Sequence, residues 1–311
     1  IVQGPDSGVT NKINRLLQLT WLRNTPKSLP KGADIFKRTA YQHNDSGVHS
    51  GYTNIDYAIV FQSHRVLSLR LDLETMAAYP ESYSKYQNFN LQNGTPILTA
   101  DLFTEEGLQR LRTYLQEERK KIIREAGMVA KAEKMNEEDQ DYISKSLTEC
   151  NLEPEENNAV IDSAGMIFFR SNCFPHVARG MEADLSVKIP SAKLSPWLNV
   201  YGKKLFSEPT ANIRQDGLSG LHKPLPGSIG KYPVVLMLER LDGNYVSGYY
   251  YYQSREIAIE LSGERKGNNL VLHEYDEEGS TGTIRAAIKG NTLTGTWTGS
   301  NGKQLPISVK N

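Results

Sequence analysis

Tyrosines are the side chains most concentrated in this sequence. The stretch GNYVSGYYYYQSREIAIELSG, residues 243–263, places five tyrosines within eight positions and continues into an alternation of apolar and polar residues. Because tyrosine combines a flat apolar ring with a hydroxyl group, a surface cluster of tyrosines suits recognition of a glycan or a protein. The alternative interpretation is that these rings fill the inside of a small β-barrel.

Side-chain direction within a strand divides these tyrosines into two sets. Successive side chains point to opposite faces, so Tyr245, Tyr249 and Tyr251 share one face. Tyr250 and Tyr252 share the other face. One set is expected among aliphatic side chains, which leaves at most two or three rings on the surface. The candidate glycan-binding pair is Tyr250 and Tyr252, and this prediction requires both rings to lie together on the outer face.

A second aromatic cluster lies at residues 76–87, where AAYPESYSKYQNF indicates a loop that leads into a short strand. Aromatic side chains on loops bury a large area at little cost in conformational entropy, which favours recognition of a protein or glycan partner. The candidate binding residues of this loop are Tyr79, Pro80, Tyr83 and Tyr86. In the alternative interpretation, Tyr79 and Phe89 fill the core beneath the loop.

Known catalytic motifs fail on their spacing. The segment GTWTGSNGK has Trp297 where a phosphate-binding loop needs glycine, and no Ser or Thr follows Lys303. Ser82 and Lys85 form a Ser-x-x-Lys pair, but the companion motifs of penicillin-recognising enzymes are absent. No Gly-x-Ser-x-Gly nucleophile elbow occurs. The sequence therefore nominates no catalytic residue.

Metal-ligand spacing is also missing from the sequence. The six histidines are scattered, and Cys173 and His176 have no second pair at zinc-site spacing. Acidic residues 276–278 fall in a turn, where solvent exposure is far commoner than the paired carboxylates of glycosidases. We therefore predict no metal and no other cofactor.

The length and composition limit the number of domains and the kinds of partner that this protein can have. The 311 residues fit about two domains, and 36 basic against 36 acidic residues argue against a nucleic-acid partner. No run of about 18 apolar residues occurs, so no transmembrane segment is expected.

The two cysteines, Cys150 and Cys173, allow either one disulfide or two buried thiols. The start at Ile1 rather than Met suggests either a trimmed chain or a mature form that has lost a signal peptide.

The first two thirds of the chain mix helix and strand patterns. TNKINRLLQLTWL, residues 10–22, has apolar residues at helical spacing, and residues 52–76 alternate as two antiparallel strands around a turn at QSHR. The strongest helix follows Thr104, its expected N-cap, and ends near Gly127. A second helix is expected after Asn136.

The last third has a different pattern. Turn sequences recur about every 10 to 14 residues, without a helical stripe, which predicts an antiparallel meander of about six to eight strands in a barrel or half-barrel. The predicted fold is thus α+β, with N-terminal helices packed on an antiparallel sheet, followed by a small all-β domain. The predicted domains are residues 1–206 and 228–311, joined by a linker at 207–227.

Several segments carry a resemblance to a known family. NIDYAIVFQSHRVLSLRLDLETMAAYPESYSKYQNFNLQNGTPILTADLF, residues 54–103, shows two strands, a small-aromatic-proline step, NFNLQNG, and DLF before a helix. FFRSNCFPHVARG and KIPSAKLSPWL follow later. Together they resemble the RsiV-like extracytoplasmic domain over residues 9–206. The chain has Ala77-Ala78-Tyr79-Pro80 where many members carry Gly-Ala-His-Pro.

The resemblance implies a cellular location and a function. This domain occurs in lysozyme-sensing anti-sigma factors, beside some polysaccharide deacetylase domains, and in stand-alone secreted or lipid-anchored bacterial proteins. It implies an extracytoplasmic location (periplasmic, secreted or lipid-anchored), a Cys150–Cys173 disulfide, and a binding protein for lysozyme, another envelope protein or peptidoglycan. The alternatives are a cell-wall hydrolase or deacetylase-like enzyme, and a structural or assembly module of the envelope.

Overall fold

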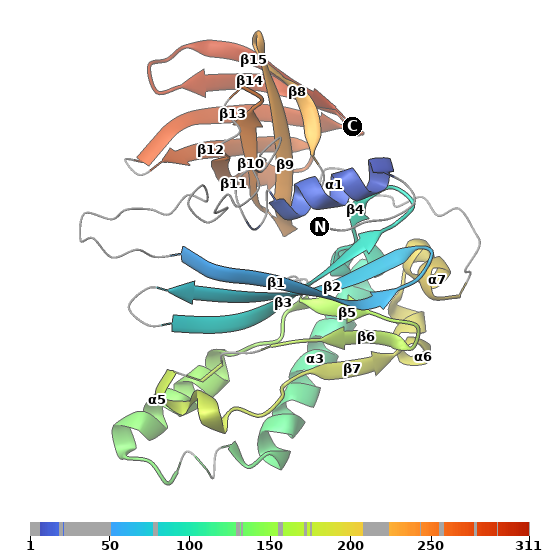
Figure 1. Ribbon diagram of the computed structural model, residues 1–311, viewed down its shortest axis with the longest axis vertical. Helices are drawn as coiled ribbons and strands as arrows, with labels where there is room; N and C mark the ends of the chain where they lie inside the picture. The colour runs from blue at the N-terminus through green and yellow to red at the C-terminus, as the bar shows by residue number, and fades with distance from the viewer. Residues whose placement is uncertain are drawn as a thin grey trace. The chain divides into compact units, whose positions relative to one another are not determined.

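The structure is a computed structural model that divides into two compact units. Unit 1 comprises Ile1–Ser50, Gln92–Pro96 and Gln215–Asn311, and unit 2 comprises Gly51–Leu91 and Ile97–Arg214. The structure describes residues 7–18, 21, 51–76, 80–128, 131, 133–154, 158–170, 173–174, 176–207, 224–242, 244–254, 258–276, 279–290 and 292–310. The predicted class is confirmed, because helices with antiparallel sheets precede a closed β-barrel (Figure 1).

Three long antiparallel strands open unit 2. They are β1 (Gly51–Gln62), β2 (Val66–Met76) and β3 (Pro80–Asn90). Leu71 of β2 lies opposite Tyr57 on one side and Lys85 on the other. Ser63 holds the turn between β1 and β2, because its N–H donates to the Val66 carbonyl and its Oγ accepts from the Val66 N–H. The predicted hairpin is therefore confirmed.

The predicted loop at residues 76–87 is wrong from Pro80 onward, since β3 begins there. Met76 lies opposite Pro80 and Arg70 lies opposite Tyr86, so this segment belongs to the sheet. Its aromatic residues Tyr83, Tyr86 and Phe89 recur every third position, so the segment lacks the period-two pattern that would indicate a strand. Tyr79 lies outside the described residues.

A small second sheet and a long helix form the main core of unit 2. The strands are β5 (Ala159–Ile161), β6 (Gly165–Phe168) and β7 (Val187–Pro190), and the helix is α3 (Glu105–Glu125). Leu111 and Leu115 of α3 share one buried cluster with Phe168 and Ile189 of the sheet. Thr104 caps α3 as predicted, because its Oγ1 accepts the Gly107 N–H at 2.9 Å.

Shorter helices complete unit 2. They are α2 (Thr99–Leu102), α5 (Glu137–Glu149), η4 (His176–Met181), α6 (Ser191–Leu194), η5 (Ser195–Trp197) and α7 (Val200–Ser207). Asn136 caps α5, because its Oδ1 accepts the Asp139 N–H at 2.9 Å. A Cβ on Gly107 would clash with the Trp197 carbonyl, so α3 approaches η5 this closely only because residue 107 is glycine.

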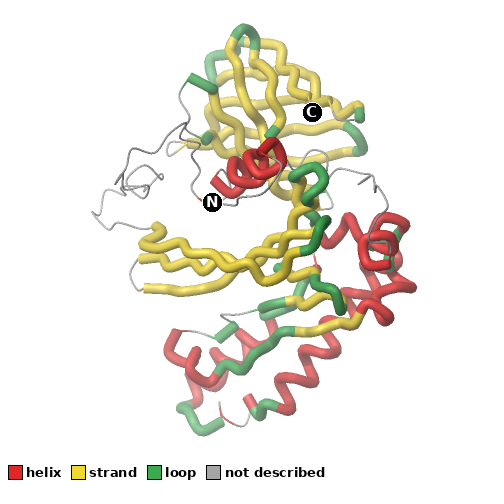
Figure 2. Tube along the Cα trace, turned by 45° about the vertical axis from the view of Figure 1, so that its right-hand side comes forward, coloured by secondary structure: helices red, strands yellow, loops and turns green. Residues whose placement is uncertain are grey.

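The C-terminal strands close into a barrel, as Figure 2 shows. Its strands are β8 (Leu225–Ile229), β9 (Tyr232–Asp242), β10 (Tyr245–Tyr252), β11 (Ile259–Lys266), β12 (Asn269–Asp276), β13 (Gly279–Lys289), β14 (Thr292–Gly299) and β15 (Gln304–Lys310). Consecutive strands pair antiparallel, and β15 pairs back to β8 with Ile307 opposite Ile229. The predicted meander is therefore confirmed, and it is closed.

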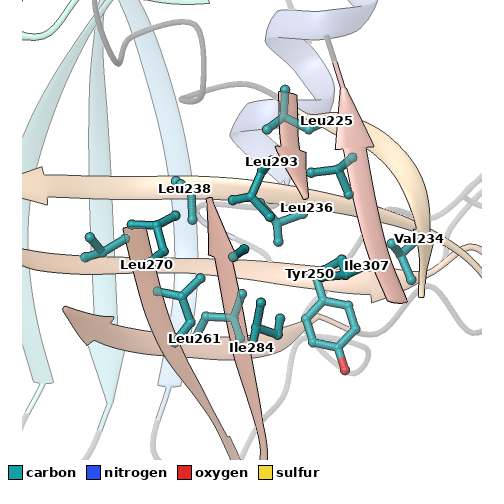
Figure 3. Packing of buried hydrophobic residues seen from close by; sticks show 14 of the residues in the cluster. Leu225, Val234, Leu236, Leu238, Tyr250, Leu261, Leu270, Ile284, Leu293 and Ile307 are labelled. Carbon is teal, nitrogen blue, oxygen red and sulfur yellow. The ribbon is translucent and has the colours of Figure 1, made fainter. Parts of the chain in front are cut away.

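Aliphatic side chains from every strand fill the barrel (Figure 3). An eight-stranded barrel has an interior just wide enough for side chains to occupy. One inward residue of each strand, β8 to β15 in order, is Leu225, Leu236, Val246, Leu261, Leu270, Ile284, Leu293 and Ile307. Alternate residues along each strand therefore face outward, which determines which tyrosines a partner could reach.

Unit 1 also contains α1 (Ser7–Leu17) and the short strand β4 (Thr95–Pro96). The compact units thus divide the chain differently from the predicted boundaries at 1–206, 207–227 and 228–311, because α1 and β4 group with the barrel. Among the described residues, no helix has the length and apolar character that a membrane crossing requires.

Candidate functional site

A row of side chains crosses three strands on the outside of the barrel. Tyr249 of β10 lies opposite Glu260 of β11, and Glu260 lies opposite Tyr275 of β12. Directly opposed residues of antiparallel strands project on the same face, so the carboxylate lies between two aromatic rings. Together with Tyr245, Ser247 and Ser262, among others, the row lines a shallow hollow of about 140 Å³.

The strand phase explains why this row faces outward. Val246 and Tyr250 are 0% and 1% exposed and belong to the barrel core, so the odd-numbered residues between them project from the barrel wall. Tyr245 and Tyr275 are 46% and 45% exposed. Tyr249 is almost buried, so its ring forms the floor of the hollow.

The next row adds hydroxyl groups and an imidazole. Ser247, Ser262 and His273 lie opposite one another on β10, β11 and β12. Thr283 follows on β13, with its Oγ1 3.3 Å from His273 Nδ1. This outer face of β10–β12 therefore combines aromatic rings, an exposed carboxylate and hydroxyls, a set that can stack on a sugar ring and hydrogen-bond its hydroxyls.

Part of the outward-facing tyrosine set serves the fold instead. Arg15 of α1 donates a hydrogen bond from Nη1 to the hydroxyl of Tyr251 at 3.2 Å. Tyr251 is 2% exposed. The outer tyrosines accessible from solvent on β10–β12 are therefore those at the hollow.

The predicted surface pair Tyr250 and Tyr252 is wrong, because both rings point into the barrel. Tyr250 is fully buried, and Tyr252 packs against the barrel core with its ring centroid 5.5 Å from that of Tyr250. Burial and the neighbouring Glu274 raise the pKa of Tyr250 far above its usual range. The sequence could not select the phase, because tyrosine occupies inward and outward positions alike in YYYY.

The predicted tyrosines of β3 do not form one patch. Tyr83 lies opposite Leu73 and Tyr86 lies opposite Arg70, so the two rings project from opposite faces of the sheet. The Tyr86 ring stacks on Phe169 with centroids 3.8 Å apart, and burial raises its pKa. Pro80 begins β3. A binding role for Pro80, Tyr83 and Tyr86 stays a prediction.

Cys150 and Cys173 form a disulfide, with Cα atoms 5.4 Å apart. The bond joins the end of α5 to the segment before η4, beside the buried residues Ile143 and Leu147. The pairing that the family resemblance implies is therefore confirmed. Within the part of the chain that the structure describes, no group of three or more His, Cys, Asp or Glu side chains could hold a metal ion.

Comparisons with known proteins give a distant structural similarity. No protein-family model matches the sequence, and no curated protein matches it. Among solved structures, the chain is similar to a member of the DUF3298 family from Bacteroides fragilis. The likeness covers 68% of this chain and 85% of that chain, with 14% sequence identity and a TM-score of 0.43. Membership of the RsiV-like family stays a prediction from the motifs.

Proposed function

We propose that this protein is an extracytoplasmic binding protein that recognises a cell-wall glycan through the outer face of β10–β12. The observation that carries the proposal is the cross-strand row of Tyr249, Glu260 and Tyr275 along a hollow in the barrel wall. Exposed tyrosines are normally scattered, whereas here Tyr245 and Tyr275 stand at the same hollow, nearly half exposed.

The size of the hollow suits one sugar unit lying on the surface. Its volume of about 140 Å³ corresponds to about five water molecules at roughly 30 Å³ each. Enclosed pockets for drug-sized ligands take about 300–1,000 Å³. The hollow therefore has room for one sugar ring of a glycan chain and is too small to enclose a drug-sized ligand. This supports recognition of a polymer at the surface rather than capture of a small metabolite.

The disulfide supports the extracytoplasmic part of the proposal. Disulfides persist in oxidising compartments and are rare in the cytosol. The Cys150–Cys173 bond joins two segments inside a buried cluster of unit 2. A periplasmic, secreted or lipid-anchored location is compatible with that bond.

Calorimetric titration with chitin oligosaccharides and soluble peptidoglycan fragments tests the proposal. Tyr275→Ala and Tyr245→Ala are each expected to weaken glycan binding about five- to ten-fold, because each removes a stacking ring. Tyr232→Ala is the matched control, since Tyr232 is 43% exposed on β9 and does not line the hollow. If all three variants bind alike, or no fragment binds, the glycan proposal fails.

Lysozyme is the protein ligand that the RsiV-like resemblance implies, and it stays a prediction. A pull-down with immobilised lysozyme is the direct measurement. Capture that Tyr275→Ala leaves intact, together with no affinity for glycans, would replace glycan recognition by protein recognition at another surface. Release of reducing ends or acetate from peptidoglycan fragments would instead favour the hydrolase or deacetylase alternative.

A further inference from the structure

A groove of about 840 Å³ lies between α3 and α5 in unit 2. This volume is within the range of about 300–1,000 Å³ that is typical of small-molecule sites. Its apolar floor comes from Ile123 of α3 and from Ile143 and Leu147 of α5, all of which are buried. The groove is separate from the outer face of β10–β12, which belongs to unit 1.

A buried guanidinium lines this groove. Arg119 is 5% exposed, and its Nη1 and Nη2 donate to the carbonyl of Leu147 at 2.8 and 3.0 Å. Its Nε has no hydrogen-bond partner among the described residues. Leu147 lies in the last turn of α5. The positive charge of Arg119 is therefore opposed by a neutral carbonyl and by the partial negative charge at the C-terminal end of this helix.

The charges around the groove leave that guanidinium uncompensated. The lining includes three cations, Arg119, Lys120 and Arg124, against two carboxylates, Glu133 and Asp141, which leaves one positive charge. Lys120, Arg124, Glu133 and Asp141 are all exposed, so water screens them, whereas Arg119 is buried. Desolvation, and then the nearby Arg170, lower the pKa of Arg119. A buried charge without a counter-charge is costly unless a ligand supplies one.

We propose that this groove binds a small organic monocarboxylate. The carboxylate supplies the counter-charge to Arg119, because a guanidinium matches carboxylate geometry. The apolar body of the ligand lies over Ile123, Ile143 and Leu147. One negative charge balances the charged side chains that line the groove.

Titration of the full chain with hexanoate tests the proposal, with hexanamide as its neutral counterpart. Hexanoate is expected to bind at least about ten-fold more tightly, because only the anion forms a charge-assisted hydrogen bond. The binding is expected to shift backbone amide resonances of α3 and α5. Equal affinity for the two compounds, or no saturable binding of hexanoate, would overturn the proposal.

Two independent variants locate the site. Arg119→Gln keeps a donor for the Leu147 carbonyl and removes the charge, and it is expected to weaken hexanoate binding about ten-fold or more. Ser144→Trp changes an exposed lining residue and fills the groove without changing its charge, so it should also abolish binding. Arg110→Gln is the control, since Arg110 is an exposed arginine of α3 outside the lining. Unchanged affinity in Ser144→Trp would contradict the assignment even if Arg119→Gln fails to fold.

This proposal and the proposed glycan function can fail separately. Tyr275→Ala is expected to leave hexanoate binding unchanged, and Ser144→Trp is expected to leave glycan binding unchanged. Loss of hexanoate binding in Tyr275→Ala would show that the anion binds elsewhere and would overturn the groove assignment.

Discussion

The hydroxyl of Tyr250 donates a 2.7 Å hydrogen bond to Oε1 of Glu274 inside the β-barrel. Trp297 Nε1 donates to the same oxygen, and the Thr281 hydroxyl approaches the other carboxylate oxygen at 3.4 Å. A Cβ at Gly282 would lie 2.6 Å from Glu274 Oε2, so this glycine makes room for the carboxylate. The buried acid is thus accommodated by donors from β10, β13 and β14 and by the absence of a side chain at Gly282.

Removal of the Tyr250 hydroxyl is expected to destabilise the barrel. Tyr250→Phe leaves the 3% exposed Glu274 carboxylate with one donor fewer, which costs about 1–3 kcal/mol of unfolding free energy. Urea denaturation followed by circular dichroism measures the loss. Tyr232→Phe, at an exposed position of β9, is the control and should change stability by less than about 0.5 kcal/mol. A Tyr250→Phe variant as stable as that control would refute the role of this hydrogen bond.

The two sheets of unit 2 are joined by a buried asparagine. Asn88 of β3 accepts hydrogen bonds at Oδ1 from the Ile161 N–H (3.0 Å) and the Ser68 hydroxyl (2.6 Å). Its Nδ2 donates to the Ala159 carbonyl at 2.7 Å. The Asn88 side chain therefore satisfies the backbone of β5 as a neighbouring strand would.

Asn88→Ala is expected to lower the unfolding free energy by about 2–4 kcal/mol, because it leaves buried backbone groups of β5 without partners. Chemical denaturation measures the change. Ser82→Ala, an exposed substitution on the same strand, serves as the reference and should stay within about 0.5 kcal/mol of the parent. Similar stability of the two variants would show that water replaces the lost bonds.

Two buried tyrosines predict a loss of stability in alkali. Burial raises the pKa of Tyr250, with a further contribution from Glu274, and burial raises the pKa of Tyr201, with a further contribution from Asp101. Above about pH 10 the unfolded chain loses these phenol protons while the folded chain keeps them. Because the unfolded state then binds fewer protons, stability falls with rising pH, by about 1.4 kcal/mol per pH unit for each tyrosine.

Denaturation curves between about pH 9 and pH 11 measure this slope. Tyr250→Phe and Tyr201→Phe should each make the alkaline slope shallower, whatever they do to stability at neutral pH. Tyr245→Phe, at a nearly half-exposed position of β10, is the reference substitution. An alkaline slope that neither buried substitution alters would show that other groups dominate the alkaline transition.

Local patterns predict the helices and the hairpins of this chain well. Thr104 and Asn136 cap α3 and α5 where the sequence places them, because capping needs only a side-chain oxygen and a nearby backbone N–H. The hairpin of β1 and β2 follows from alternation within 25 residues, 52–76. The first half of β3 is missed, because Tyr79-Pro80 looks like a loop start although a proline is tolerated as the first residue of a strand.

The sequence by itself determined that the last third is a meander of turns and strands, and that the tyrosines of β10 divide between two faces. Only the tertiary structure decided that β15 closes on β8, that Tyr250 turns inward to Glu274, and that Tyr249, Glu260 and Tyr275 form one row. The physical reason is register. A period-two pattern with tyrosine on both faces has no preferred phase, and the phase is selected by Val246 and the aliphatic residues of strands far away in the sequence.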